Sequence, residues 1–346
     1  MKIFIAGHRG LVGSAILRQL NAKGYDDIVT RSHNELDLAN QSQVNDFFEK
    51  EKPEYVFLAA ARVGGILANM TYPADLIYSN LTIGTNVIHA SYKHGVRKLI
   101  NLGSSCIYPR LAPQPMKEDY LLTGSLEPTN EAYAVAKIAI IKLCRYYNQQ
   151  YGTNFISLMP TNQYGPNDNF NMETAHLLPM ILRRFHLAKL LSLEDFDAIR
   201  LDLIKHPFGY PLPKNLNDNK AIETALNNVG AYRDKVIVWG DGSVYRELMH
   251  SDDLADACIY IIEKYNANDI GELVNITSGE DIQLKKLYPM VKDVVGFTGH
   301  IEYINPDLNG MPRKLMDVTK IQKLGWRPKI SLTNGIKMFY ESYLNE

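Results

Sequence analysis

Hydrophobic and polar positions alternate in a regular way along the first 160 residues, and this pattern predicts the secondary structure. Short apolar runs rich in β-branched residues predict strands at residues 2–6, 27–31, 55–59, 98–102 and 154–159. Between them, apolar residues recur at helical spacing near residues 12–23, 41–51, 73–94 and 131–151. Strands that are apolar nearly throughout are buried on both faces by helices. The predicted fold class is therefore α/β, a doubly wound parallel sheet.

After residue 160 the alternation loosens, which predicts a smaller, mixed lobe. We expect helices near residues 176–188, 252–265, 284–295 and 332–344, and strands at 235–239 and 273–276. Residues from about 187 to 234 carry three prolines and many Asn and Asp residues without a strand pattern, so we expect a partly helical insertion there. The predicted organisation is a first domain over residues 1–160, to which a later strand and later helices return, and a second lobe over residues 161–346.

Composition and charge exclude several classes of protein. The 346 residues are 46% hydrophobic and 22% charged, as in globular proteins, and the formal net charge is −1. This balance predicts neither nucleic acid nor an anionic membrane as a partner. No run approaches the roughly 18 apolar residues that a spanning helix needs. The first strand begins at residue 2 and the three cysteines are scattered, so we expect no leader, no disulfide framework and a cytoplasmic protein.

A glycine-rich turn follows the first predicted strand. The segment Gly-His-Arg-Gly-Leu-Val-Gly at residues 7–13 leads directly into a predicted helix. The turn can be tight, and its backbone can approach a pyrophosphate closely, because it contains Gly7, Gly10 and Gly13. The helix that follows begins with Leu11 and Val12, and its N-terminus stabilises the negative charge of the pyrophosphate. A tight turn that binds nothing is the alternative, but the position between strand and helix favours a dinucleotide-binding (Rossmann) domain.

The end of the second predicted strand bears on which dinucleotide binds. An acid at this position would hydrogen-bond the adenosine ribose, whereas a cation would accommodate a 2′-phosphate. Arg31 lies there and Arg9 lies in the glycine turn, while the nearest acids are Glu35 and Asp37. This favours NADP over NAD, with Arg31 as an ordinary surface charge the alternative. No spacing typical of a metal site is present, so no metal is expected.

Tyr133 and Lys137 lie four residues apart on one face of a predicted helix. The spacing alone is weak, because the sequence contains four Tyr-x-x-x-Lys matches. What distinguishes this one is the segment Gly-Ser-Ser-Cys-Ile-Tyr-Pro at residues 103–109, which places hydroxyl groups at the carboxyl end of the fourth strand, where ligands bind in open α/β sheets. Ser104 could share a substrate carbonyl with Tyr133, and we expect Lys137 to lower the pKa of the phenol.

These motifs together resemble the extended short-chain dehydrogenase/reductase superfamily and, within it, the GDP-L-fucose synthases. The similar segments span nearly the whole chain and include residues 4–14, 59–65, 102–109, 127–131, 159–166 and 311–314. The glycine turn and Tyr-x-x-x-Lys are typical of the superfamily, whereas Gly-Ser-Ser-Cys-Ile-Tyr-Pro is particular to this group. The resemblance implies an NADPH-dependent 3,5-epimerase and 4-reductase of a GDP-4-keto-6-deoxy sugar, working as a homodimer packed through the helices at 73–94 and 131–151.

The resemblance also implies roles for individual residues. Tyr133 would protonate the C4 oxygen, Ser104 would polarise the carbonyl and Lys137 would hold the cofactor ribose. Cys106 and His176 would exchange the protons on C3 and C5, since a thiol and an imidazole both titrate near neutral pH; which is acid and which is base stays open. Ala59 and Ala60 would line the cofactor. The remaining residues match positions used around the GDP-sugar: Asn162, Arg184, Trp239, Arg246 and Lys314.

Some segments depart from the family pattern. Gln163, the run at residues 171–176, Met311 and the insertion near 187–234 all lie around the expected sugar pocket or its rim. They bear on the identity of the sugar more than on the reaction. The alternative is a C4 reductase of another GDP-4-keto sugar, such as a 6-deoxyheptose, with or without epimerase activity. A more remote alternative is a catalytically silent dinucleotide-binding protein.

Overall fold

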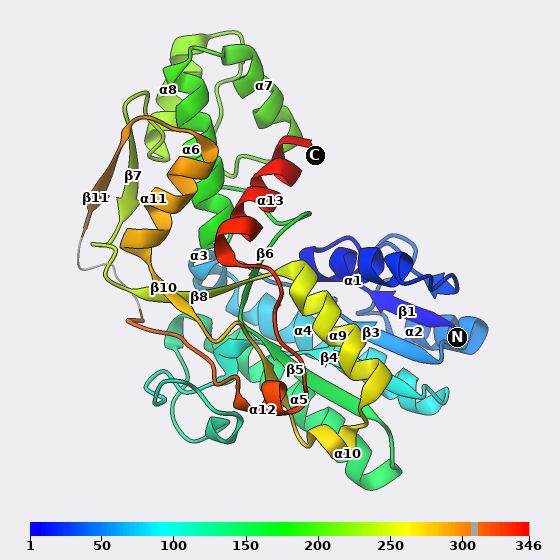
Figure 1. Cartoon of the computed structure of the whole chain (residues 1–346). Coiled ribbons are helices and arrows are strands. Elements are labelled where there is room, and N and C mark those ends of the chain that lie inside the picture. The colour runs from blue at the N-terminus through cyan, green and yellow to red at the C-terminus, as the bar shows by residue number, and fades with distance from the viewer. Residues whose placement is uncertain (306–310, 346) are drawn as a thin grey trace.

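The computed structural model of the chain describes residues 1–305 and 311–345. Within these residues the main sheet has six parallel strands in the order β2-β1-β3-β4-β5-β9 (Figure 1). The strands are β1 (Ile3–Ala6), β2 (Ile28–Val29), β3 (Tyr55–Leu58), β4 (Lys98–Leu102), β5 (Phe155–Pro160) and β9 (Val274–Ile276). The chain direction across the sheet reverses at β1, so the glycine turn lies at the switch point where open α/β sheets bind ligands. The predicted fold class is confirmed.

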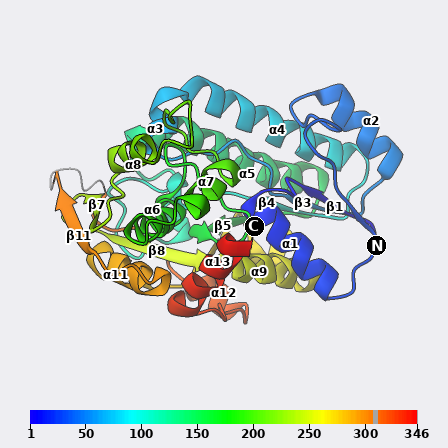
Figure 2. The same ribbon diagram turned by 90° about the horizontal axis from the view of Figure 1, so that it is seen from above.

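Helices cover both faces of this sheet (Figure 2). Ile3 and Ile5 of β1 pack with α1 (Leu11–Ala22) and α9 (Ser251–Lys264) on one face. Phe4 and Ala6 point the other way, because successive side chains of a strand alternate, and pack under α2, α4 and α5. The bounds of these three helices are Gln41–Glu51, Pro73–Lys93 and Glu131–Tyr151. The core of the first half is therefore completed by α9, a helix from the second half of the chain.

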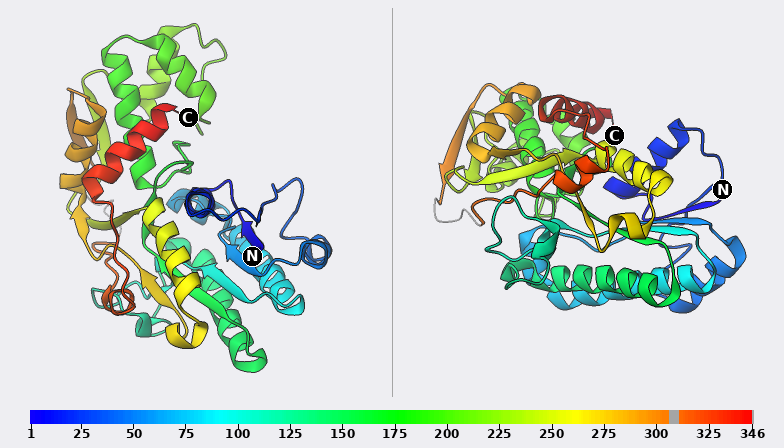
Figure 3. Two further views of the ribbon diagram at one scale, coloured as in Figure 1. Left: turned by 45° about the vertical axis from the view of Figure 1, so that its right-hand side comes forward. Right: turned by 60° about the horizontal axis from the view of Figure 1, so that its bottom comes forward.

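The second half contains two small sheets and several helices (Figure 3). One sheet joins β6 (Asn162–Tyr164), β8 (Tyr245–His250) and β10 (Asp281–Gln283), and the other joins β7 (Lys235–Trp239) and β11 (His300–Ile304). Their shared core is closed by α6 (Leu177–Ser192), α11 (Leu284–Val295) and α13 (Leu332–Asn345). β6 starts directly after β5, so the small sheet with β8 extends from the carboxyl end of the main sheet.

The segment expected to be an insertion contains the end of α6 and two further helices, α7 (Phe196–Lys205) and α8 (Asn219–Asn228). It is tied into the lobe by a buried ion pair. Arg183 is fully buried and donates from Nε and Nη2 to Asp202 Oδ1 at 3.0 and 2.8 Å. Tyr343 of α13 hydrogen-bonds the other oxygen of the same carboxylate. The insertion and the C-terminal helix therefore share one buried polar centre.

The sequence pattern misses the shorter elements. These are α3 (Ile66–Thr71), α10 (Ala267–Ile270), α12 (Thr319–Lys323), the strands β6, β8, β10 and β11, and three single 3₁₀ turns at Ser105–Ile107, Glu118–Tyr120 and Pro128–Asn130. The missed strands are only three to six residues long and pair with partners far away in the sequence, so local periodicity does not reveal them. Within the described residues, none of the helices combines the length and apolarity needed to span a membrane.

Candidate active site

Two of the three glycines in the turn after β1 have no room for a side chain. Gly7 has φ +89°, and a Cβ there would lie 2.7 Å from the Ala60 nitrogen. A Cβ on Gly13 would lie 2.1 Å from the Gly7 oxygen, so α1 could not pack against the turn with a side chain. At Gly10 the nearest atom to a Cβ would be 3.6 Å away. Gly7 and Gly13 are required by the fold, and Gly10 leaves open the space where a pyrophosphate would approach.

The N-terminus of α1 fits a phosphate group. Gly10 is the N-cap and brings no side chain to cap the helix, so the N–H groups of Leu11 and Val12 in the first turn have no partner within the helix. Ala59 follows β3 and donates its N–H to the Ala6 oxygen, which places the predicted cofactor residues Ala59 and Ala60 beside the turn. The residues present therefore fit a dinucleotide.

Arg9 and Arg31, predicted to favour NADP, share one acidic neighbour, Glu35. Both charges lower the pKa of Glu35, after the larger effect of its hydrogen bonds from Ser32. Arg31 is already engaged, because its Nη2 donates to Glu51 Oε1 at 2.6 Å. Arg9 is exposed. Arg9 can therefore turn toward a ribose phosphate directly, whereas Arg31 would share its guanidinium with Glu51.

Ser104, Cys106, Tyr133 and Lys137 come together at the carboxyl end of β4. Ser104 Oγ lies 2.8 Å from Cys106 Sγ, and the phenol of Tyr133 hydrogen-bonds Ser104. Lys137 Nζ donates to the Leu102 oxygen at 2.8 Å and lies 5.7 Å from the centroid of the Tyr133 ring. Tyr133 and Lys137 share one face of α5, which runs without interruption from Glu131 to Tyr151.

The electrostatics of this cluster differ from our expectation for Lys137. Burial raises the pKa of Tyr133, the charge of Cys106 adds to this, and the hydrogen bond from Ser104 opposes it. Burial lowers the pKa of Lys137 to about 8, with Cys106 opposing. The ammonium does not act on the phenol as expected because it lies over the ring and bonds a backbone oxygen rather than the hydroxyl. The phenol therefore holds its proton firmly at neutral pH.

His176 and Lys314 approach the same cluster from the second half. His176 is the N-cap of α6 and its surface is exposed, while desolvation by the surrounding protein, and then the charge of Lys314, lower its pKa. Burial lowers the pKa of Lys314 as well, and the leading opposing effect is the charge of Cys106. The ammonium of Lys314 is thus within electrostatic reach of both the imidazole of His176 and the thiol of Cys106.

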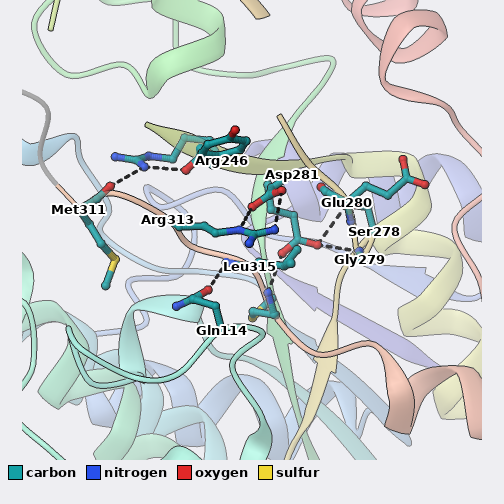
Figure 4. A network of polar contacts seen from close by, with 12 residues as sticks. Gln114, Arg246, Ser278, Gly279, Glu280, Asp281, Met311, Arg313 and Leu315 are labelled. Carbon is teal, nitrogen blue, oxygen red and sulfur yellow. Dashed lines mark hydrogen bonds and ion pairs between the residues drawn. The ribbon is translucent and has the colours of Figure 1, made fainter. Parts of the chain in front are cut away.

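Arg184 and Arg246 form a second, cationic site. Burial lowers the pKa of Arg184 to about 10, and the phenols of Tyr288 and Tyr210 partly offset the effect. Burial also lowers the pKa of Arg246, and the phenol of Tyr288 opposes this effect. Arg246 Nη1 donates to the Met311 oxygen at 2.8 Å (Figure 4). Arg184 Nε is buried and has no partner among the described residues. Two desolvated guanidinium groups around one tyrosine fit an anion such as a diphosphate.

The other two predicted substrate residues differ in their surroundings. Asn162 Nδ2 donates to the Glu247 oxygen at 2.9 Å, where β6 meets β8. Trp239 ends β7 with 65% of its surface exposed, and no described contact joins it to Arg184 or Arg246. Asn162 therefore lies at the junction of the two halves, while Trp239 stays at the surface.

Glu247 was missed by the sequence analysis. Its carboxylate is fully buried on β8 and accepts hydrogen bonds from the N–H groups of Gly279 and Met316 at 2.8 and 3.1 Å and from Ser278 Oγ at 3.1 Å. Burial raises its pKa to about 6, against the effect of these bonds. In the sequence, an acid followed by the apolar Leu248 is only weak evidence for a buried carboxylate. The residues that donate hydrogen bonds to Glu247 are remote from it in the sequence. No group of three or more His, Cys, Asp or Glu side chains placed to hold a metal ion occurs in the described part of the chain.

Comparisons with known proteins give a consistent result. A family model described as the NAD dependent epimerase/dehydratase family matches residues 3–202 and 203–277. GDP-L-fucose synthase 1 of Arabidopsis thaliana is 50% identical over 99% of this chain and 93% of its own. The crystal structure of a GDP-6-OMe-4-keto-L-xylo-heptose reductase from Campylobacter jejuni superimposes with a TM-score of 0.92 at 42% identity, covering 99% of this chain and 97% of that one. MlghC, a GDP-mannoheptose C4 reductase from Campylobacter jejuni with NADP bound, superimposes with a TM-score of 0.86 at 43% identity, covering 99% of this chain and 98% of that one.

Proposed function

We propose that this chain, which belongs to the NAD dependent epimerase/dehydratase family, is an NADPH-dependent enzyme. Its reaction converts GDP-4-keto-6-deoxy-D-mannose to GDP-L-fucose. The reaction combines epimerisation at C3 and C5 with reduction at C4. The observation that carries the proposal is the cluster of Ser104, Cys106, Tyr133 and Lys137 at the carboxyl end of β4. The relatives named for GDP-L-fucose synthesis and for GDP-sugar reduction with NADP support the substrate class and the cofactor.

The reduction uses the hydroxyl groups of Ser104 and Tyr133. When bound, NADPH supplies the hydride that adds to C4. Ser104 and Tyr133, already hydrogen-bonded to each other, would both donate to the C4 oxygen. Because burial raises the pKa of Tyr133, the phenol keeps its proton until the oxygen becomes basic, and then gives it up. Lys137, whose ammonium lies 5.7 Å from the centroid of the Tyr133 ring, would hold the cofactor ribose beside it.

Epimerisation uses two more groups. Removal of the proton on C3 or C5 moves the electron pair of the C–H bond onto the C4 oxygen, where Ser104 and Tyr133 stabilise the enolate. Cys106 lies beside the group that holds the ketone, because its Sγ is 2.8 Å from Ser104 Oγ. His176 approaches from α6. One of Cys106 and His176 takes the proton from one face, and the other returns a proton to the opposite face.

The remaining residues bind the two nucleotides. Arg184 and Arg246 hold the diphosphate of the substrate, and the buried, unpartnered Nε of Arg184 is one donor for it. Asn162 and Trp239 contact the sugar and the base end of the substrate. Arg9, with Arg31, holds the 2′-phosphate that distinguishes NADPH from NADH.

The second candidate function is C4 reduction of a GDP-4-keto heptose without epimerisation. It is favoured by the similarity to the two Campylobacter jejuni reductases, which are named for heptose substrates. The two functions differ in proton exchange. In D₂O without NADPH, the epimerase should incorporate deuterium at C3 and C5 of GDP-4-keto-6-deoxymannose, measured by mass spectrometry and NMR. Reduction of the heptose substrate with no incorporation at either carbon would favour the second candidate.

The catalytic cluster is tested by Tyr133→Phe, with Tyr146→Phe as the matched control on the same helix. Tyr146 is 55% exposed, so its hydroxyl group contributes nothing to the cluster. We expect Y133F to lose about 10²–10⁴-fold in kcat for NADPH oxidation, as for a lost general acid. The control should match the unsubstituted enzyme. NADPH oxidation by Y133F at the full rate would overturn the proposal.

We also propose a homodimer formed through α4 and α5. The two helices present stacked aromatic side chains at the surface, with the rings of Tyr92 and Tyr151 4.2 Å apart and 37% and 45% of the residues exposed. A second copy of the chain would cover these rings, and sedimentation velocity of the Tyr92→Glu variant checks the assembly. A cytoplasmic location is in keeping with Cys106, Cys144 and Cys258, which are all free thiols.

A further inference from the structure

Three segments that carry predicted substrate residues meet at Glu247 on β8. Asn162 of β6 donates from Nδ2 to the main-chain oxygen of Glu247 at 2.9 Å. Arg246 is the neighbour of Glu247 along β8. The third segment, residues 311–317, is here called the strap; it contains Lys314 and is hydrogen-bonded to the side chain of Glu247. Glu247 therefore joins three groups that lie far apart in the sequence.

The two oxygens of the Glu247 carboxylate hold different segments. Oε1 accepts from the hydroxyl of Thr277, from Ser278 Oγ at 3.1 Å and from the Gly279 N–H at 2.8 Å. Oε2 accepts from the Met316 N–H at 3.1 Å. Glu247 is fully buried, so these donors replace water around its carboxylate. One oxygen is thus bonded to the turn that follows β9, and the other is bonded to the strap.

The start of the strap is bonded to β8 as well. The Tyr245 N–H donates to the Pro312 oxygen at 2.9 Å. Arg246 Nη1 donates to the Met311 oxygen at 2.8 Å (Figure 4). Lys314 lies in the sequence between these two bonds and the bond to the buried carboxylate. The strap is therefore fixed to β8 on both sides of Lys314.

The charges of Arg246 and Lys314 act on each other across this arrangement. Desolvation lowers the pKa of Lys314, the charge of Cys106 opposes this effect, and the charge of Arg246 lowers the pKa further. The charge of Glu247 also favours the ammonium. Like charges repel each other, so bonds elsewhere in the strap are needed to hold Lys314 near Arg246.

We propose that Glu247 is a positioning residue for the GDP-sugar, which sets the separation of Arg246 and Lys314 by holding the strap through Oε2. The inference rests on the proposed function, in which Arg246 holds the diphosphate, and on the substrate role that the family resemblance implies for Lys314. A ligand binds more tightly to groups that are already in place, because ordering them on binding would cost free energy. Glu247 therefore acts on the affinity for the substrate through these two cations.

The variant Glu247→Gln separates the two oxygens. A glutamine side chain has one oxygen, which accepts, and one NH₂ group, which donates. Because three donors surround Oε1 and one donor faces Oε2, the amide oxygen takes the place of Oε1. The NH₂ group then meets the Met316 N–H, and two donors cannot bond each other. E247Q should therefore release the strap, while the turn after β9 and Asn162, which bonds the main-chain oxygen, keep their contacts.

The test measures binding and turnover separately in E247Q. We expect the Kd for GDP, measured by isothermal titration calorimetry, and the KM for the keto-sugar both to rise about tenfold. The value of kcat should stay within about twofold of the wild-type value, as for a loss of uniform binding. The matched control is Glu280→Gln, which removes the same charge from an exposed side chain on the neighbouring turn. E280Q should match the wild-type enzyme in Kd, KM and kcat.

A purely structural role for Glu247 gives a different result. A lower melting temperature of E247Q, with unchanged Kd for GDP and unchanged KM, would overturn the inference. A loss confined to kcat would also overturn it. If E247Q does not fold, Thr277→Val replaces it, because this variant keeps the carboxylate and removes one donor to Oε1. T277V should raise the Kd for GDP by about threefold, and an unchanged Kd in that variant would overturn the inference.

The outcomes also distinguish this inference from the proposed function. If the wild-type enzyme does not turn over the keto-sugar while the Kd for GDP still depends on residue 247, the proposed function fails and the positioning role stands. If the keto-sugar is turned over and neither Kd nor KM depends on residue 247, the proposed function stands and the inference fails.

Discussion

The buried ion pair between Arg183 and Asp202 predicts a large cost for Asp202→Ala. Arg183 is fully buried and Asp202 is 6% exposed, and the carboxylate accepts from Nε and Nη2 of the arginine. Removing the carboxylate leaves a guanidinium out of water with only backbone oxygens as partners, those of Phe170, His206 and Pro207. Loss of one partner of a buried pair costs about 3–5 kcal/mol. For a chain of this size, the melting temperature should fall by roughly 5–10 °C.

The same helix provides the control. Asp197 accepts from Arg200 Nη1 at 2.7 Å, nearly the same distance as in the buried pair, but 99% of its side chain is exposed. Asp197→Ala should therefore change the melting temperature little, because water screens the pair. The double variant Arg183→Met with Asp202→Leu removes both charges and should recover much of the loss. Differential scanning calorimetry of the three variants checks this, and equal melting temperatures for D202A and D197A would refute the reasoning.

Three further predictions concern protonation and the glycine turn. Because burial lowers the pKa of Lys137 to about 8, kcat/KM for the keto-sugar should fall as the pH rises through 8, and a pH profile that stays flat to pH 10 would contradict this. Burial lowers the pKa of His186 to about 4, so between pH 6.5 and 4 the unfolded chain binds a proton that the folded chain does not. The free energy of unfolding should therefore fall by about 3 kcal/mol as the pH drops across this range. In urea titrations, His186→Phe should make this free energy depend less steeply on pH. Gly10→Ala should keep the melting temperature but weaken NADPH binding in a fluorescence titration, whereas Gly13→Ala, whose Cβ would lie 2.1 Å from a backbone oxygen, should lower the melting temperature as well.

The long helices could be predicted from sequence because their own residues determine where they begin and end. The segments at residues 41–51, 131–151 and 284–295 form helices with these bounds. Asn40 caps the first by accepting from the Gln43 N–H, and Gly152 and Gly296 end the other two in the left-handed region. The strands β6, β8 and β10 form instead because segments from residues 162, 245 and 281 meet, and no local pattern records that meeting.

The candidate site shows the same division. Ser104, Tyr133 and Lys137 could be placed together because a strand end and the first turns of a helix meet at a known edge of the sheet. The sequence did not reveal Glu247, since its role depends on Gly279 and Met316, which join it only in the folded chain. The ion pair of Arg31 with Glu51 was also hidden, because a residue in α2 supplies the carboxylate.

The edge strand β9 has a consequence for how the molecule is made. β5 gains this neighbour only from residues 274–276, and α1 is covered only when α9 arrives. A nascent chain that has left the ribosome up to residue 160 therefore exposes an unpaired strand and an apolar helix face, both of which favour aggregation. The dinucleotide half cannot mature ahead of the rest, and exchanging it between homologues by a single crossover near residue 160 would separate strands that must pair.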